Sequence, residues 1–214
     1  QLGAILAIVW LYRTRLQGAV ASARHDRTSR RFLANLLIAF LPAAVVGFFA
    51  HEWIKARLFQ PDIVAGALVL GGLLILLIEW WAPVSRIQEV GDTTPRAALG
   101  IGLAQVLSLV PGISRSGATI MGGYALGLSR VAATEFSFFL AVPVMLAATL
   151  FDLLESRSAL VPSDVPMFAV GFIVSFVSAV IVVRAFLSYV SGHSFSLFAW
   201  YRIVFGAVLL MTRG

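Results

Sequence analysis

The sequence predicts an all-α polytopic membrane protein with six transmembrane helices and one re-entrant helical hairpin. Of the 214 residues, 60% are hydrophobic and only 12% are charged, whereas soluble domains carry about 25% charged residues. Apolar stretches near the length of about 20 residues that crosses a bilayer recur along the chain. These observations exclude a secreted enzyme, a nucleic-acid-binding module and a disordered chain. Because the sequence contains no cysteine, disulfides, thiolate metal sites and cysteine nucleophiles are excluded as well.

Six apolar stretches are the candidate spans. They cover residues 2–12, 33–50, 63–81, 131–153, 167–190 and 195–211. The first is short because the sequence begins inside an apolar run, at Gln1 and without a methionine, which predicts that an N-terminal part has been removed. Pro42 and Pro143 lie in mid-span, where membrane helices tolerate proline because neighbouring groups satisfy the freed carbonyls.

The charged segments between the spans predict the orientation in the membrane. Arginines crowd the segment between the first two spans, at Arg13, Arg15, Arg24, Arg27, Arg30 and Arg31, which places this loop in the cytoplasm by the positive-inside rule. Loop 82–96 then also faces the cytoplasm, and loops 52–62 and 154–166 face outward. The net charge of +6 therefore reflects membrane topology and indicates no nucleic-acid partner.

Residues 97–128 do not fit the pattern of a span. Their apolar arms, 97–110 and 117–128, have 14 and 12 residues, and at about 1.5 Å per residue neither crosses a core of roughly 30 Å. Pro111 cannot donate to a helix ladder and Gly112 permits positive φ, so the first arm should end there. We expect a re-entrant hairpin that enters from the cytoplasmic side and turns at membrane depth.

The order of the elements predicts an inverted repeat. Three spans precede the hairpin and three follow it, so two such units in tandem would have opposite orientations. We therefore expect one integral membrane domain over 1–214, with 1–96 the remnant of a first repeat and 97–214 the second. The hairpin of the first repeat would precede Gln1.

The hairpin tip combines three features that favour anion binding: hydroxyl groups, an arginine and the N-terminus of a helix. Ser114, Ser116 and Thr119 offer hydroxyl groups, and Arg115 carries a charged fork that matches phosphate oxygens. The second arm begins near Gly117, so its free N–H groups point at the same place, with Ser114 or Ser116 as the N-cap. The alternative is a buried structural turn in which Arg115 binds helix carbonyls and the hydroxyls cap the helix.

Other polar residues leave more than one interpretation open. Arg202 lies about seven residues into the last span, too deep to reach the interface, and either contacts the anion or pairs with a buried carbonyl or carboxylate. Gln105, in an apolar arm, needs a buried partner and either packs or orients the tip. We expect Glu79 to be solvated, and Glu135 to be a helix N-terminal charge or a partner of Arg130 rather than a catalytic carboxylate.

The tip motif Pro-Gly-Ile-Ser-Arg-Ser-Gly-Ala-Thr at 111–119 resembles the signature of the undecaprenyl-diphosphate phosphatases, the bacitracin-resistance proteins of bacteria. The likeness continues at 1–7, 135–143, 166–173 and 198–202, and so covers essentially the whole chain. The resemblance implies an inner-membrane protein that hydrolyses undecaprenyl diphosphate to undecaprenyl phosphate and inorganic phosphate. That reaction regenerates the lipid carrier of cell-wall synthesis.

The resemblance also implies roles for individual residues. It implies that Arg115, Ser114, Ser116 and Thr119 hold the diphosphate as the catalytic set, and from their places in and beside the tip we take Gly112, Gly117, Gln105 and Arg202 as the substrate-binding set. The expected partners are a polyprenyl diphosphate lipid and the bilayer, and a homodimer is left open. The different-class alternatives are a transporter or flippase for an anionic phospholipid-like substrate, and a purely structural membrane subunit.

One part of the family pattern has no counterpart in the sequence. The family uses a glutamate-rich motif, a serine and a histidine in its N-terminal hairpin, whereas His25, His51 and His193 lie in loops or at span ends. The divalent cation that the resemblance implies, Mg²⁺ or Ca²⁺, belongs to that acidic motif, so we assign no metal ligand here. We expect this chain alone to turn over little substrate.

Overall fold

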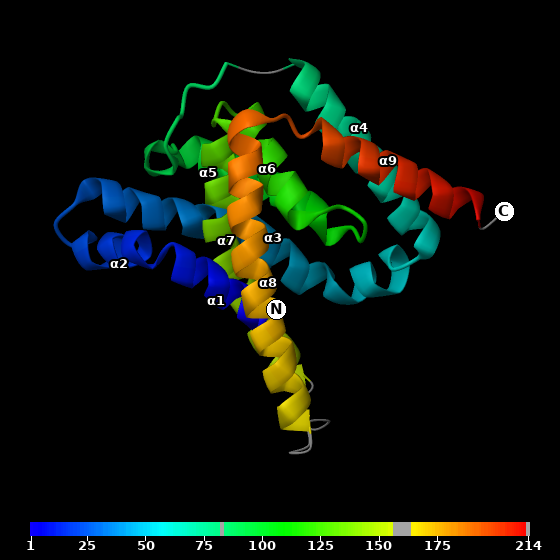
Figure 1. Ribbon diagram of the computed structural model, residues 1–214, viewed down its shortest axis with the longest axis horizontal. Helices are drawn as coiled ribbons and strands as arrows, with labels where there is room; N and C mark the ends of the chain where they lie inside the picture. Colours follow the sequence, from blue (N-terminus) through cyan, green and yellow to red (C-terminus); the bar gives the residue numbers. More distant parts are fainter. Residues whose placement is uncertain (82–83, 156–163, 213–214) are drawn as a thin grey trace.

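The computed structural model describes residues 1–81, 84–155 and 164–212 as an all-helical molecule (Figure 1). Its α-helices are α1 (Leu2–Leu11), α2 (Arg13–Ser22), α3 (Arg27–Leu58), α4 (Pro61–Trp81), α5 (Pro95–Val106), α6 (Arg115–Ala125), α7 (Arg130–Glu155), α8 (Val165–Gly192) and α9 (Ser196–Met211). Two 3-10 turns, η1 (Val90–Asp92) and η2 (Leu107–Leu109), flank α5. Within the described residues, extended pairing is limited to one isolated bridge between Ile87 and Leu128. The all-α prediction is confirmed.

Four of the six predicted spans are long and apolar enough to cross a membrane. These are α3, α4, α7 and α8, with 32, 21, 26 and 28 residues. Helices α1 and α9 are apolar but have 10 and 16 residues, fewer than the about 20 needed for a full crossing. The polytopic class is thus confirmed, whereas a count of six full crossings is not. Most of the predicted outer loop 154–166 lies outside the described residues.

The prediction of a long arginine-rich loop between the first two spans is wrong, because most of residues 13–32 is helical. Arginine, glutamine and alanine favour helix, and α2 forms from them directly after Tyr12. Asp26 then caps α3, accepting hydrogen bonds from the backbone N–H groups of Thr28 and Ser29 at 3.2 and 2.7 Å. Hydrogen bonds from Ser29 and Thr28 lower the pKa of the Asp26 carboxyl.

Helices α5 and α6 form the predicted hairpin. The Thr94 side chain caps α5, accepting from the backbone N–H of Ala97 at 3.1 Å. The first arm ends earlier than expected, at Leu109, because Val110 precedes a proline and adopts an extended conformation with ψ 118°. Gly112 turns the chain with φ +95°. The second arm begins at Arg115, two residues before the expected start.

The hairpin is held between α3 and α7 by close backbone contacts. A Cβ on Gly102 of α5 would lie 2.9 Å from the Cα of Ala39 in α3, and one on Gly123 of α6 would lie 3.1 Å from the Cβ of Ala133 in α7. The largest fully buried side chains, Phe136, Phe139, Ile101, Leu128 and Leu140, fill this region. The core of the molecule therefore supports the hairpin directly.

On the other side of the tip, α4 and α9 run side by side (Figure 1). Glycines let the two helices approach closely. A Cβ on Gly72 would lie 2.6 Å from the Ile203 Cγ1, and one on Gly206 would lie 2.8 Å from the Ala65 carbonyl oxygen. In this helix pair, a helix that precedes the hairpin packs against a helix that follows it, as an inverted repeat would require. The repeat itself stays a prediction.

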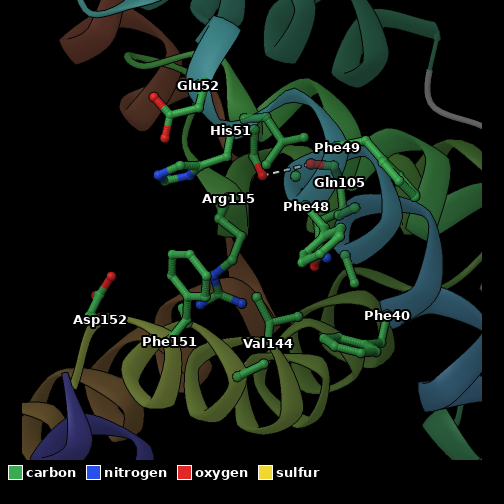
Figure 2. A pocket seen from close by; sticks show the side chains of 17 residues that line it. Phe40, Phe48, Phe49, His51, Glu52, Gln105, Arg115, Val144, Phe151 and Asp152 are labelled. Atoms are coloured by element: carbon green, nitrogen blue, oxygen red, sulfur yellow. Dashed lines mark hydrogen bonds between the residues drawn. The ribbon is translucent and has the colours of Figure 1, made fainter. Parts of the chain in front are cut away.

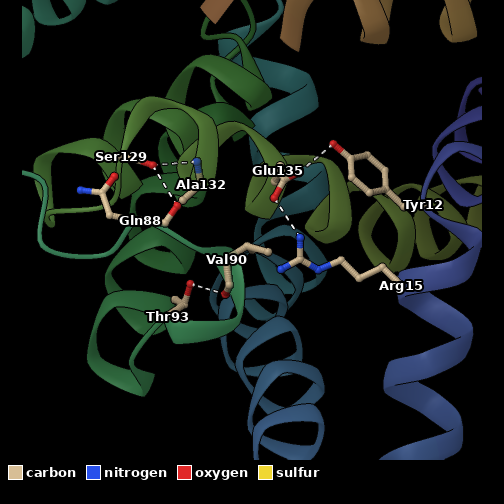
Figure 3. Close-up of polar contacts among 8 residues, drawn as sticks. All are labelled: Tyr12, Arg15, Gln88, Val90, Thr93, Ser129, Ala132 and Glu135. Atoms are coloured by element: carbon tan, nitrogen blue, oxygen red, sulfur yellow. Dashed lines mark hydrogen bonds and ion pairs between the residues drawn. The ribbon is translucent and has the colours of Figure 1, made fainter. Parts of the chain in front are cut away.

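Two ion pairs differ from the sequence-based expectations. Glu79 is not solvated: its carboxylate pairs with Arg130 at 2.6 Å and also accepts the backbone N–H of Phe195 at 2.8 Å. Glu135 pairs instead with Arg15 at 3.2 Å and accepts from the Tyr12 hydroxyl at 3.4 Å (Figure 3). The folded chain brings these helices together in a way that sequence spacing does not indicate.

Candidate functional site

The hydroxyl groups of the tip organise the first turn of α6. Ser114 is the N-cap, with its Oγ accepting from the Gly117 backbone N–H at 3.1 Å and lying 3.1 Å from the Ser116 Oγ. Thr119 is fully buried; its hydroxyl donates to the Arg115 carbonyl oxygen at 3.0 Å and lies 2.7 Å from the Ser137 hydroxyl of α7. The predicted capping by Ser114 is confirmed, and the turn that carries Arg115 is tied to α7.

Arg115 borders a large cavity. This cavity has a volume of about 710 Å³ and lies between α3, α7 and the hairpin. Figure 2 shows Arg115 in its centre, His51 and Glu52 on one side, and Phe151 and Asp152 on another. The remaining lining is mostly apolar and includes Phe40, Phe48, Phe49, Val144 and Gln105. A permanent cation thus faces a space large enough for part of a lipid.

Polar atoms without partners converge on this cavity. The Arg115 Nη1, the His51 Nε2 and both side-chain polar atoms of Gln105 are buried and have no hydrogen-bond partner among the described residues. Gln105 is only 1% exposed. A buried polar group without a partner costs about 1–3 kcal/mol, so such atoms are rare in folded proteins. Their concentration around one cavity is typical of a ligand site.

The other predicted site residues border a second, smaller cavity. Ser114, Ser116, Gly117 and Arg202 line a space of about 290 Å³ together with apolar residues of α4, α6, α8 and α9. Neither Arg115 nor Gln105 lines this space. Gly112 contacts α4, and Thr119 lines neither cavity. The structure therefore gathers the predicted residues at and around one hairpin tip, where two line the Arg115 cavity, four line the smaller cavity, and Gly112 and Thr119 line neither.

The structure identifies three cavity residues that the sequence analysis did not select. His51 and Glu52 were expected at the edge of a loop, but α3 continues to Leu58 and carries them into the cavity wall. Asp152, to which no role was assigned, lies opposite on α7. The helical spacing along α3 could have indicated that His51 lines the cavity. One face of this helix carries Phe40, Ala43, Ala44, Gly47 and His51.

The described residues do not by themselves form a site for a divalent cation. The described ranges contain no group of three or more histidine, cysteine, aspartate and glutamate side chains that could hold a metal ion. Glu52 and Asp152 border the Arg115 cavity, yet they do not belong to such a group. No catalytic step is therefore assigned to a metal.

Known proteins resemble this chain over nearly its whole length. The chain is 53% identical to an undecaprenyl-diphosphatase of Nitrosospira multiformis, over 99% of this chain and 78% of that protein. It is 54% identical to undecaprenyl-diphosphatase 2 of Rhodospirillum rubrum, over 99% of this chain and 77% of that protein. Identity to the undecaprenyl-diphosphatase of Ectopseudomonas mendocina is 50%, with 99% and 77% covered. Residues 1–208 match the family described as bacitracin resistance protein BacA, and the chain belongs to this family of multi-pass membrane proteins.

Proposed function

We propose that this protein hydrolyses undecaprenyl diphosphate to undecaprenyl phosphate and inorganic phosphate in the bacterial inner membrane. The reaction recycles the lipid carrier of cell-wall synthesis and confers bacitracin resistance. The observation that carries the proposal is the set of buried, unpartnered polar atoms of Arg115, Gln105 and His51 around one apolar cavity. The relatives are named as phosphatases, which supports hydrolysis over transport of an anionic lipid.

Arg115 supplies the main catalytic interaction. One water is added across the bond between the terminal phosphorus and the bridging oxygen, and the bridging oxygen leaves with the lipid. Negative charge spreads over the oxygens of the transferred group in the transition state. The guanidinium of Arg115 faces this charge from the wall of a mostly apolar cavity, where a preorganised donor is more effective than in water.

The other tip residues hold Arg115 in place. Ser114 and Ser116 shape the start of α6, and Thr119 ties that turn to α7 through Ser137. By this role the three hydroxyl residues position Arg115 and are not themselves catalytic groups. Gln105 is the second group that meets the diphosphate, because its amide lines the same cavity as Arg115 and has no partner of its own.

The cavity favours access from the outer face of the membrane. Its wall includes His51 and Glu52 near the end of α3, and Phe151 and Asp152 near the end of α7. These ends precede the segments that the positive-inside rule places outside. Aromatic and aliphatic side chains of α3 and α7 line the path, as the prenyl chain of the substrate requires. A homodimer stays a proposal, tested by the mass of the detergent-solubilised protein.

The experiment is the release of inorganic phosphate from undecaprenyl diphosphate in detergent by the protein as the bacterium makes it, with a divalent cation present. Replacing Arg115 by alanine should lower kcat by about 10²–10³-fold, the effect of losing one transition-state donor. Arg57→Ala is the matched control, since Arg57 is exposed in the last turn of α3 and lines neither cavity. Lipid binding without phosphate release by the unsubstituted protein would contradict the proposal and favour transport.

A further inference from the structure

The side chain of Arg202 is bonded to the hairpin tip rather than directed into the cavity of Arg115. Its Nη2 donates to the Gly112 carbonyl oxygen at 2.9 Å and to the Ala67 carbonyl oxygen at 3.4 Å. Arg202 lies on α9, Ala67 on α4 and Gly112 in the tip, so one guanidinium joins three segments. We propose that Arg202 is a positioning residue. By binding the Gly112 carbonyl it fixes the hairpin tip, and so keeps the Arg115 guanidinium where the reaction needs it.

The Gly112 carbonyl is a suitable point at which to hold the tip. Gly112 has φ +95°, and a Cβ there would lie 3.0 Å from the Cα of Val64 and from the Cβ of Ala67. The tip therefore rests directly on α4 at its sharpest bend. Arg115 follows three residues later and begins α6, so a shift of the Gly112 peptide moves the start of the helix that carries the reacting guanidinium.

Gly71 is the second part of this arrangement. A Cβ at this position of α4 would collide with the Nη2 of Arg202 and lie 3.1 Å from its Cζ. A glycine here lets the guanidinium pass α4 and reach the tip. Gly66, on the same helix, has nothing within 4 Å of the place that a Cβ would occupy. The two glycines therefore form a matched pair for substitution.

The placement of Arg202 argues against direct contact with the diphosphate. Arg202 is absent from the residues that line the Arg115 cavity, and it borders the smaller cavity beside Ser114 and Ser116. Its Nη2 already serves two carbonyl oxygens, while its buried Nε has no hydrogen-bond partner among the described residues. A group that binds Arg115 from the large cavity thus lies on the side of the tip opposite to Arg202. This role rests on the proposed function, because it concerns the rate of the same phosphate release.

The first test compares Gly71→Ala with Gly66→Ala in the protein as the bacterium makes it, by phosphate release in detergent. Gly71→Ala should lower kcat by about 10- to 100-fold with KM within about twofold, because a misplaced catalytic group slows the reaction without weakening binding. Gly66→Ala should leave both constants unchanged. A rise of KM at constant kcat would indicate that Arg202 binds substrate directly and would overturn the proposal, as would equal effects of the two substitutions.

The second test uses Arg202 itself. Arg202→Met removes the donor and should lower kcat like Gly71→Ala, whereas Arg202→Lys should restore part of the rate because an ammonium can still donate to Gly112. Combining Arg202→Met with Gly71→Ala should cost no more than the larger single loss, since both act on one contact. Additive losses would overturn the proposal. If Arg202→Met fails to fold, the kcat values of Gly71→Ala and Arg202→Lys still show whether loss of the contact with Gly112 slows the reaction.

A measurement without turnover reports the tip directly. The 214 residues contain no cysteine, so Ile113→Cys places a single thiol beside Gly112 within them. Maleimide should react with this thiol several-fold faster when Gly71→Ala or Arg202→Met is also present, and at an unchanged rate with Gly66→Ala. Unchanged rates in all backgrounds would overturn the proposal. Absence of phosphate release from the unsubstituted protein would instead refute the proposed function, and with it the role of Arg202.

Discussion

At the scale of single residues, the cavity is defined by polar groups that the protein leaves unsatisfied. Arg115 and His51 each bury one nitrogen without a partner, and Gln105 buries its whole amide. Each such group lowers the stability of the folded protein, because it has lost its water without gaining a hydrogen bond. A polar ligand that enters and bonds these groups recovers the cost. These residues therefore trade stability against binding.

Gln105→Leu is expected to separate the two effects. The substitution keeps the size of the side chain but removes the unpartnered amide, so thermal stability in detergent should rise, by about 1–3 kcal/mol at most. The KM for undecaprenyl diphosphate should rise as well, because one donor to the diphosphate is lost. The matched control is Gln88→Leu, since Gln88 is exposed and donates to the Ser85 carbonyl at 2.9 Å. A stability loss with unchanged KM would show that Gln105 serves packing alone.

At the scale of elements, the base of the hairpin is closed by a partly buried ion pair. Glu79 near the end of α4 is only 8% exposed in its side chain, and Arg130 begins α7 directly after the hairpin. Glu79 also accepts the backbone N–H of Phe195, just before α9. One carboxylate thus fixes the ends of three helices. A second pair, Arg15 with Glu135, is more exposed at 40% and 20%.

Arg130→Met is expected to destabilise the protein by about 2–3 kcal/mol, because it leaves the Glu79 carboxylate buried without its partner. Arg15→Met removes the more exposed pair and should cost less than about 1 kcal/mol. Thermal unfolding in detergent measures both values. Adding Glu79→Gln to Arg130→Met should recover part of the loss, since a neutral amide can still accept from Phe195. Equal costs for the two arginine substitutions would contradict this account.

At the scale of the whole molecule, the cavity and the charged segments predict which face of the membrane the substrate reaches. Arginines gather on α2 and at the start of α3, whereas His51 and Asp152 lie toward the opposite ends of α3 and α7. The base of the hairpin lies on the arginine-rich side of the molecule. Its tip borders the cavity from that same side. A charged headgroup that enters the cavity from the other side can thus reach Arg115 without passing the hairpin.

Single cysteines placed in these cysteine-free residues test the orientation. A thiol at the exposed Gln60, between α3 and α4, should react with a membrane-impermeant maleimide added to intact cells. A thiol at the exposed Ala21 on α2 should react only after the membrane is opened. The positive-inside rule is the physical reason. The reverse pattern would place the arginines outside and contradict access to the cavity from the outer face.

Local chemistry explains how much could be predicted from the sequence. The apolar composition determined the membrane class, and Pro111 with Gly112 determined where the hairpin turns, because these residues limit their own backbone. Ser114 was recognisable as a cap for the same reason. Each of these features depends on neighbours within a few positions. The motif around Arg115 identified the chemistry, since its residue types suit a phosphate in any fold that brings them together.

Tertiary structure decided which side chains meet. Glu79 and Arg130 are 51 residues apart in sequence, and Arg202 and Gly112 are 90 apart. No spacing rule links residues at such distances, because helix packing sets the approach of their side chains. The same packing carried His51 into the wall of the Arg115 cavity and Arg202 to the back of the tip. The sequence alone thus determined the membrane class and the anion-binding motif, while the arrangement of α3, α4, α7 and α9 around the hairpin decided which residues share its site.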